Sequence, residues 1–148
     1  METVRPPSAD ELGRCAELLA TARVEASRHR GGARLVPERA PSGEDLAAWV
    51  TDGSRLLLAG LFDGAVVGVG GASIGPGGLG KIEACYVERG AREVGVGAAL
   101  LRGLLDWLAA RACTDIDATA LPGDRLTKQL LEAAGFKTRL LILHRPQD

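Results

Sequence analysis

One glycine-spaced segment limits the architectures open to this chain: Arg92-Glu93-Val94-Gly95-Val96-Gly97-Ala98. An apparent strand, Lys81 to Val87, precedes it, and an apolar-striped helix continuing to about Ala112 follows it. Such a turn directs unpaired backbone N–H groups at the positive end of the helix dipole, where they bind an anion such as a pyrophosphate. We therefore predict an anion-binding turn, the alternative being a turn whose glycines only relieve steric crowding.

A second glycine motif, Gly75-Pro76-Gly77-Gly78-Leu79-Gly80, matches the GxGxxG spacing of dinucleotide-binding proteins. It precedes a strand and no helix follows it, so no helix N-terminus would point at a phosphate. We predict a plain turn between two strands at this place.

Apolar periodicity and turn residues predict an alternating series of helices and strands. Ser8 and Ser42 begin capped helices, Asp63-Gly64 is the turn of a hairpin, and a further helix runs from Asp124 to Gly135. The expected strands are Val4 to Pro7, Arg55 to Phe62, Ala65 to Ile74, Lys81 to Val87, Ile116 to Leu121 and Phe136 to His144.

The helix from Asp124 carries a second signature, which closes with Gly135-Phe136. Taken with the glycine segment, in this order and spacing, it resembles the GCN5-related N-acetyltransferases, the GNAT superfamily. The resemblance covers nearly the whole chain and is strongest from Lys81 to Phe136. It departs at two positions, because Asp124 stands where the family usually has Asn, and Leu131 where it often places the tyrosine that protonates the leaving thiolate.

The resemblance implies one α/β domain over residues 1–148, with helices on both faces of a mixed, mostly antiparallel sheet of six or seven strands. It implies a V-shaped cleft where the strands Lys81 to Val87 and Ile116 to Leu121 splay apart, with the backbone N–H of Val87 or Tyr86 polarising a thioester carbonyl. The implied co-substrate is acetyl-CoA or another short acyl-CoA, with no metal. The residues expected to bind it are Tyr86, Val87, Arg92, Glu93, Val94, Gly95, Val96, Gly97, Ala98, Asp124, Lys128 and Leu131.

Glu83 and Tyr86 are the candidate catalytic residues. Alternation along a regular strand predicts that Glu83 and Cys85 share one face and that Tyr86 lies on the other. We expect Glu83 to act as general base, since burial raises the pKa of a carboxylate; the alternative is a rim glutamate paired with Lys81 or Arg92. Tyr86 is the only tyrosine and so the only phenol available as an acid, and we expect Cys85 to be a buried, inert thiol.

The acceptor amine is left open by the sequence. In the resembling family a helical N-terminal segment covers the acceptor pocket, and here that segment contains Arg28-His29-Arg30. An acidic acceptor would suit Arg23, Arg28, Arg30 or Arg34, whereas a solvated basic helix face is the alternative. A protein N-terminus, lysine, a polyamine, an aminoglycoside and a small amino acid all remain candidates.

Composition argues against several other classes of protein. A net charge of −1 and only 3% aromatic residues do not favour nucleic-acid binding, and no apolar run reaches the length of a membrane span. Three widely spaced cysteines indicate reduced thiols and a cytoplasmic location. Two distant histidines make a metal site improbable. A homodimer is allowed but not specified.

We therefore predict transfer of an acyl group, which we expect to be acetyl, from coenzyme A to a primary amine of a small molecule or peptide by direct attack within a ternary complex. Because Asp124 and Leu131 depart from the family pattern, the alternative is an acyl-CoA-binding sensor or interaction domain with weak or no turnover. A third interpretation, an ATP-dependent enzyme, lacks the Lys-Ser/Thr pair of a phosphate-binding loop.

Overall fold

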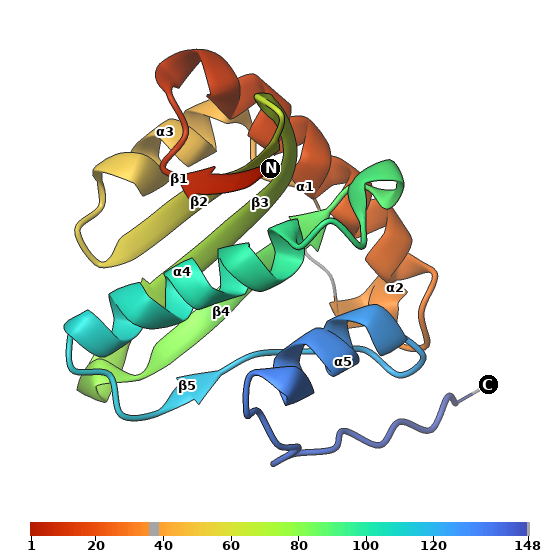
Figure 1. Cartoon of the computed structure of the whole chain (residues 1–148). Helices are drawn as coiled ribbons and strands as arrows, with labels where there is room; N and C mark the ends of the chain where they lie inside the picture. Colours follow the sequence, from red (N-terminus) through yellow and green to blue (C-terminus); the bar gives the residue numbers. More distant parts are fainter. Residues whose placement is uncertain (36–38, 148) are drawn as a thin grey trace.

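A computed structural model describes residues 1–35 and 39–147 of the chain (Figure 1). It is an α/β structure in which a five-stranded sheet, in the order β1-β2-β3-β4-β5, carries helices on both faces. The elements are β1 (Glu2–Arg5), η1 (Ala9–Glu11), α1 (Leu12–Ser27), α2 (Gly32–Leu35), α3 (Gly43–Thr51), β2 (Arg55–Phe62), β3 (Ala65–Ile74), η2 (Pro76–Gly78), β4 (Gly80–Val87), η3 (Arg89–Ala91), α4 (Val96–Ala110), β5 (Ile116–Asp117) and α5 (Arg125–Ala133).

The sheet is mostly antiparallel, as predicted. β1, β2, β3 and β4 pair antiparallel in sequence, whereas β5 pairs parallel with β4. The β2–β3 hairpin turns at Asp63 and Gly64, both of which have positive φ, as the favoured two-residue hairpin turn requires. The GxGxxG match at residues 75–80 lies in the connection between β3 and β4, around η2, and opens no long helix. The predicted turn is therefore confirmed.

Helices cover both faces of the sheet (Figure 1), and two apolar clusters form the core, one on each face. On the first face α4 buries Leu100, Leu104 and Leu108 completely against β2 and β3. On the second face α1 and α3 bury Cys15 and Leu46 completely. α5 packs on the same face as α4. This arrangement leaves the carboxyl end of β4 and the start of α4 at one edge of the molecule, where the site lies.

The predicted number of strands is wrong. The segment expected to be the last strand, Phe136 to His144, has no strand partner, and the strand expected from Ile116 to Leu121 ends at Asp117. Apolar alternation supplies a residue pattern for a strand, but a strand also needs a neighbouring edge to bond with. Within the described residues the sheet therefore has five strands, not six or seven. No helix in the described parts of the chain is long and apolar enough to cross a membrane.

Candidate active site

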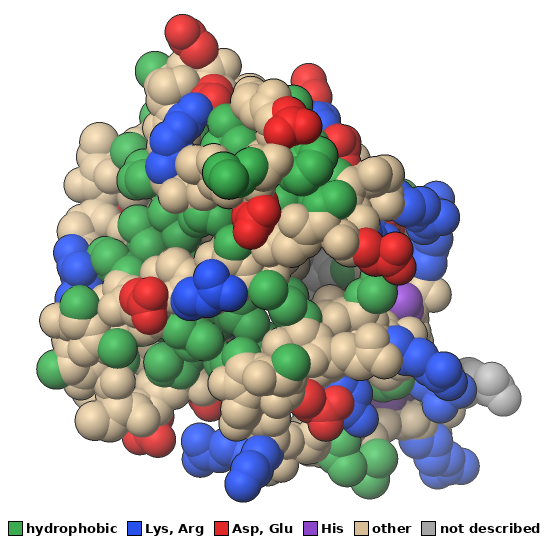
Figure 2. Space-filling model, in the orientation of Figure 1, with side chains coloured by type: hydrophobic (Ala, Val, Ile, Leu, Met, Phe, Trp, Pro, Cys, Tyr) green, Lys and Arg blue, Asp and Glu red, His purple; other side chains and the backbone are tan. Residues whose placement is uncertain are grey.

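A cleft opens where β4 and β5 part. The two strands pair only through Gly80 with Ile116 and Lys81 with Asp117, so the rest of β4 lies free of β5. The resulting cavity has a volume of about 1390 Å³, and it lies between β4, the loop before α4, the start of α5 and the end of α1. Figure 2 shows the surface hollowed in this region. The predicted splay of these strands is thus present.

The glycine segment forms the wall of the cleft at the start of α4. Gly95 is the N-cap of the helix, with φ 85° and ψ −2°, a left-handed conformation that favours glycine. No side chain makes a capping hydrogen bond to this end of the helix. The N–H groups of Val96, Gly97 and Ala98 belong to the first turn, where no intrahelical acceptor exists. A Cβ at Gly97 would lie 3.6 Å from Val87 Cγ2 and 3.8 Å from Leu130 Cδ2, both on cleft-lining residues. The glycine therefore leaves space between β4 and α5.

Glu93 and Val94 connect this wall to Arg92. Glu93 has a positive φ of 76°, which is uncommon for a residue other than glycine, and it lines the cleft. Val94 instead packs against the core on the α4 face. The loop thus turns one side chain toward the cleft and the next toward the core.

A bulge in β4 overturns the expected strand alternation. Ala72 pairs with Ile82 and Gly71 with Ala84, so Glu83 has no partner opposite it in β3. A bulge shifts the side chains that follow by one place relative to the faces of the sheet. The prediction that Glu83 and Cys85 share a face is therefore wrong. Cys85 packs on the α4 face, whereas Tyr86 packs on the α1 face.

The Glu83 carboxylate lies on the rim of the cleft. Its Oε1 accepts a hydrogen bond of 2.7 Å from Ser73 Oγ, and its Oε2 lies 3.8 Å from Lys81 Nζ. The side chain is 32% exposed, which leaves it in contact with solvent and with the cleft. The ion pair with Lys81 matches one of the two pairings considered from the sequence. The other does not form, because Arg92 pairs with Glu25.

Arg92 and Tyr86 meet at Glu25, a residue of α1 that the sequence analysis missed. Glu25 Oε2 accepts from Arg92 Nη2 at 2.9 Å, and Glu25 Oε1 accepts from the Tyr86 hydroxyl at 2.9 Å. Burial raises the pKa of Glu25, but the hydrogen bonds from Arg92 and Tyr86, with the charges of Arg92 and Arg89, outweigh it and hold the pKa below its usual value. Burial and the bond to Glu25 raise the pKa of Tyr86. The phenol is thus held in its protonated form against a carboxylate.

The main chain of Val87 faces the cleft. Val87 is in register with Gly68, and Glu88 N donates to Val67 O at 2.9 Å. In an antiparallel ladder alternate residues send both main-chain polar groups to the same neighbour, so Val87 directs its N–H and C=O away from β3. Arg92 Nε donates to Val87 O at 3.0 Å from that side. By the same alternation the N–H of Tyr86 points to β3, which leaves Val87 as the donor available to a ligand.

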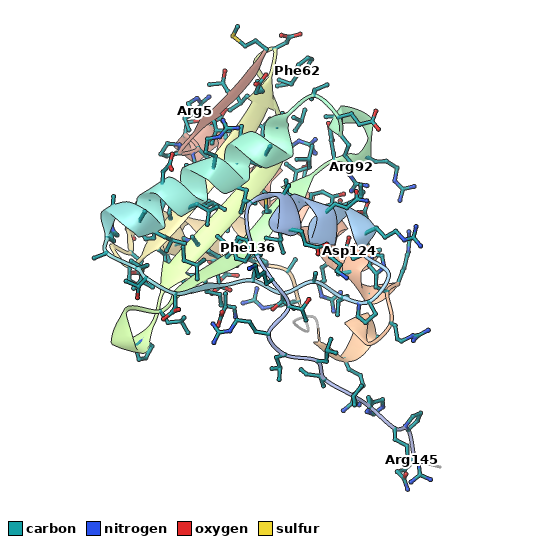
Figure 3. The ribbon with its side chains drawn as sticks, turned by 60° about the horizontal axis from the view of Figure 1, so that its bottom comes forward. Arg5, Phe62, Arg92, Asp124, Phe136 and Arg145 are labelled. Carbon is teal, nitrogen blue, oxygen red and sulfur yellow. The ribbon has the colours of Figure 1, made fainter. Side chains whose placement is uncertain are left out.

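The remaining predicted residues divide between cleft and core. Asp124 caps α5, since its side chain accepts from Thr127 N at 3.2 Å, and Figure 3 shows it at the same end of the molecule as Arg92. Leu131, at the family's tyrosine position, is only 7% exposed and packs in the core beneath α4. Thr127 and Leu130 line the cleft, whereas Lys128 and Leu131 do not. The side of α5 that faces the cleft therefore begins at Asp124 but includes neither Lys128 nor Leu131.

The Cys85 thiol also lies beside the cleft and is unreactive. It donates to Gly97 O at 3.6 Å, and burial raises its pKa to about 12. Since the thiolate is the nucleophilic form, this thiol is not a reactive nucleophile near neutral pH.

The arginine-rich end of α1 covers the cleft only in part. Arg23, Arg28 and His29 line it, and His29 Nδ1 lies 3.7 Å from the position of a Cβ on Gly123, so the segment that follows α1 nearly meets the loop before α5. Arg34 instead contacts the His144 ring at 2.6 Å. The sequence from Arg23 to Pro41, which we expect to decide the acceptor, has no recognisable pattern, and residues 36–38 within it lie outside the described residues.

Solved structures of other proteins share this fold at low sequence identity. A mutant of the BH1408 protein from Bacillus halodurans superposes with a TM-score of 0.82 at 13% identity, covering 98% of this chain and 99% of that one. Aminoglycoside antibiotic 6'-N-acetyltransferase AAC(6')-IG from Acinetobacter haemolyticus gives 0.69 at 19% identity, covering 99% and 98%. AAC(6')-Iy, in complex with the bisubstrate analog CoA-S-monomethyl-acetylneamine, gives 0.69 at 19% identity, covering 100% and 99%.

Comparison of the sequence with curated proteins gave no match. The family model described as "Acetyltransferase (GNAT) family" matches residues 16–136, which span the cleft from α1 to the end of α5. The chain belongs to the GNAT family of acetyltransferases.

Proposed function

We propose that this chain is an acyl-CoA-dependent N-acyltransferase that transfers acetyl from acetyl-CoA to a primary amine by direct attack within a ternary complex. The observation that carries the proposal is the parting of β4 and β5 after two residue pairs, beside the uncapped start of α4. An extended ligand with an anionic middle fits such a cleft, because its acyl end can reach β4 while its phosphates meet the helix N-terminus.

The residues present fit a pyrophosphate. The first-turn N–H groups of Val96, Gly97 and Ala98 lie at the positive end of α4. The space that a Cβ on Gly97 would fill lies between Val87 and Leu130. When bound, acetyl-CoA would supply an acetyl group activated as a thioester. Asp124 would contribute by fixing the start of α5 on the other wall.

Two groups of the chain would serve the transfer, in which an N–C bond forms, the C–S bond breaks and coenzyme A leaves as a thiolate that takes a proton from water. The Val87 N–H would stabilise negative charge on the carbonyl oxygen. Glu83 would take the proton lost by the attacking amine, directly or through water. Tyr86 is the one phenol near the site, but its hydroxyl donates to Glu25, so we assign it the role of holding Glu25 beside Arg92.

We propose a small-molecule amine as the acceptor. Two of the structures with this fold are named as aminoglycoside 6'-N-acetyltransferases or bind an acetylneamine analog. In this chain the Glu83 carboxylate, which is 32% exposed at the rim of the cleft, would attract an ammonium group, whereas Glu25 and Asp45 are already paired with Arg92 and Arg39.

An amine panel tests the proposal. Purified protein is mixed with acetyl-CoA and, in turn, an aminoglycoside, a polyamine, lysine and a short peptide, and release of the coenzyme A thiol is followed with a thiol reagent. We expect turnover with at least one amine that Gly95→Asp abolishes. Acetyl-CoA binding without turnover on any amine would instead support the sensor function, for which the core position of Leu131 is the motivating observation.

A further inference from the structure

We propose that Arg55 selects the acceptor, which is a small amine that also carries a carboxylate: the amine binds near Glu83 and the carboxylate binds the Arg55 guanidinium. This inference rests on the proposed function, because it names the class of amine that the transferase would acetylate. Three observations carry it. The cleft extends to Arg55, the guanidinium is held on a buried tryptophan ring, and no carboxylate of the described residues pairs with it.

The cleft has a second end, beyond Glu83. It continues to α3 and β2, where Trp49, Arg55 and Gly71 line it. Because α3 packs on the opposite face of the sheet from α4 and α5, this end is not the one that the phosphates of the coenzyme would use. The acceptor would therefore enter from the α3 side.

A row of side chains crosses the sheet from Arg55 to Glu83. Arg55 of β2 lies directly opposite Ser73 of β3, so their side chains share a face of the sheet. Ser73 Oγ donates to Glu83 Oε1 at 2.7 Å, which places the candidate base on the same face. Two strand spacings, about 10 Å, separate the backbones of β2 and β4. The two ends of the row therefore stay apart, and among the described residues Glu83 pairs with Lys81 and not with Arg55.

The Arg55 guanidinium is held in place by Trp49. Arg55 Cζ lies 3.8 Å from the centroid of the indole ring, within the range of a cation–π contact. Trp49 is only 8% exposed, and its Nε1 donates to Leu56 O at 3.0 Å, which fixes the ring. A Cβ at Gly71 would lie 2.7 Å from Trp49 Cζ2, so the ring packs directly against the backbone of β3. A guanidinium stacked on a fixed ring loses little conformational freedom when it binds a carboxylate.

The acids near Arg55 are held by other groups. Asp52 Oδ1 accepts from Ser54 N at 2.9 Å and from Ser54 Oγ at 2.7 Å, and these hydrogen bonds, more than the charge of Arg55, lower the pKa of Asp52. Asp45, which lines the cleft from α3, pairs with Arg39 at 2.8 Å. Within the described parts of the chain, the N–H donors of Arg55 are therefore left for a ligand.

The other cations of the cleft serve different places. Arg92 pairs with Glu25. Arg28 and Arg125 line the end of the cleft where the segment after α1 nearly meets the loop before α5. Arg55 is therefore the cation that a carboxylate would meet on the α3 side.

A zwitterionic acceptor fits both ends of the row. Its amine would lie at Glu83, which takes the proton lost during attack, and its carboxylate would accept two N–H bonds from the Arg55 fork. An α-amino acid carries both groups on one carbon, too close together to reach from one end of the row to the other. A straight-chain ω-amino acid separates them, and we assign the acceptor to this class.

Matched pairs of amines test the inference. Each ω-amino acid in the series β-alanine, γ-aminobutyrate, δ-aminovalerate and ε-aminocaproate is compared with the n-alkylamine of the same chain length, which lacks the carboxylate. Release of the coenzyme A thiol gives kcat and KM for the wild type, Arg55→Gln and Arg55→Lys. The matched control is Arg111→Gln, because Arg111 also stacks on a tryptophan, 4.2 Å from the ring centroid of Trp107, but does not line the cleft.

We expect the wild type to use at least one ω-amino acid with a kcat/KM at least about tenfold above that of its alkylamine, since a hydrogen bond to a charged group is worth that much or more. Arg55→Gln should abolish this preference through a higher KM at similar kcat. Arg55→Lys, which keeps the charge but not the fork, should restore part of it. Arg111→Gln should keep all of it.

The outcomes separate this inference from the proposed function. Equal use of the paired amines, a preference that survives in Arg55→Gln, or turnover of aminoglycosides or polyamines but of no ω-amino acid would overturn the inference alone. No turnover of any amine would overturn the inference and the proposed function together. Should Arg55→Gln not fold, the preference of the wild type and the partial loss in Arg55→Lys still decide.

Discussion

Gly95 and Gly97 look equivalent in the sequence, but the structure separates their roles and predicts opposite effects of alanine. Gly95 has φ 85°, and the nearest atom to a Cβ there, Glu2 Oε1, is 3.6 Å away. Space is therefore adequate and the cost of Gly95→Ala is backbone strain, about 1–2 kcal/mol. For a domain of this size that lowers the melting temperature by roughly 3–8 °C.

Gly97 lies in the first turn of α4. The methyl group of an alanine at this position would make ordinary van der Waals contacts, 3.6 Å to Val87 and 3.8 Å to Leu130. Gly97→Ala should leave the melting temperature unchanged or raise it, since alanine favours a helix over glycine by up to about 1 kcal/mol. It should nevertheless weaken acetyl-CoA binding, because the methyl group narrows the cleft.

Thermal unfolding by circular dichroism, with and without acetyl-CoA, measures both effects on both variants. Equal destabilisation by the two alanines would refute the reasoning, as would Gly97→Ala binding acetyl-CoA as tightly as the wild type.

Three further predictions concern the side chains around the cleft. Glu83→Gln should lower the turnover rate at neutral pH by ~10²-fold or more with little change in acetyl-CoA affinity; a pH–rate profile that overlays the wild type would make Glu83 structural. Glu25→Gln should destabilise the protein at neutral pH, where the charged carboxylate binds Arg92. Because the folded state lowers the pKa of Glu25 from 4.5, the difference in unfolding free energy between wild type and variant should shrink as the pH falls below that value, and urea titrations showing a pH-independent difference would contradict the assignment. Asp124→Ala should cost about 1 kcal/mol through the lost cap on Thr127 N, whereas Asp124→Asn should cost less; equal losses in urea unfolding would mean that the charge, not the cap, matters.

Much of the architecture could be predicted because its signals are local. The Asp63-Gly64 hairpin, the caps at Ser42 and Asp124 and the leucine stripe of α4 depend on residues a few positions apart. The glycine turn was recognised for the same reason, since strand, glycines and helix follow one another directly in the chain.

The errors arise where distant segments meet. The bulge at Glu83 depends on how β4 registers with β3, and a one-residue shift changes the face of every side chain beyond it. Glu25 lies 67 residues from Arg92, and a lone glutamate on a helix carries no sign of its partner. The last strand was predicted from its apolar residues, but its pairing depends on an edge that the pattern cannot supply.

The most direct test of the proposed function is a thermal-shift titration of the wild-type chain with acetyl-CoA, ATP and NADPH side by side. A ligand at ~100 times its dissociation constant adds about 2.7 kcal/mol of stability, which corresponds to a rise of roughly 5–10 °C in a domain of this size. We predict such a rise with acetyl-CoA and none of that size with ATP or NADPH. No rise with acetyl-CoA, or a larger one with ATP, would contradict the claim that the start of α4 holds the pyrophosphate of an acyl-CoA.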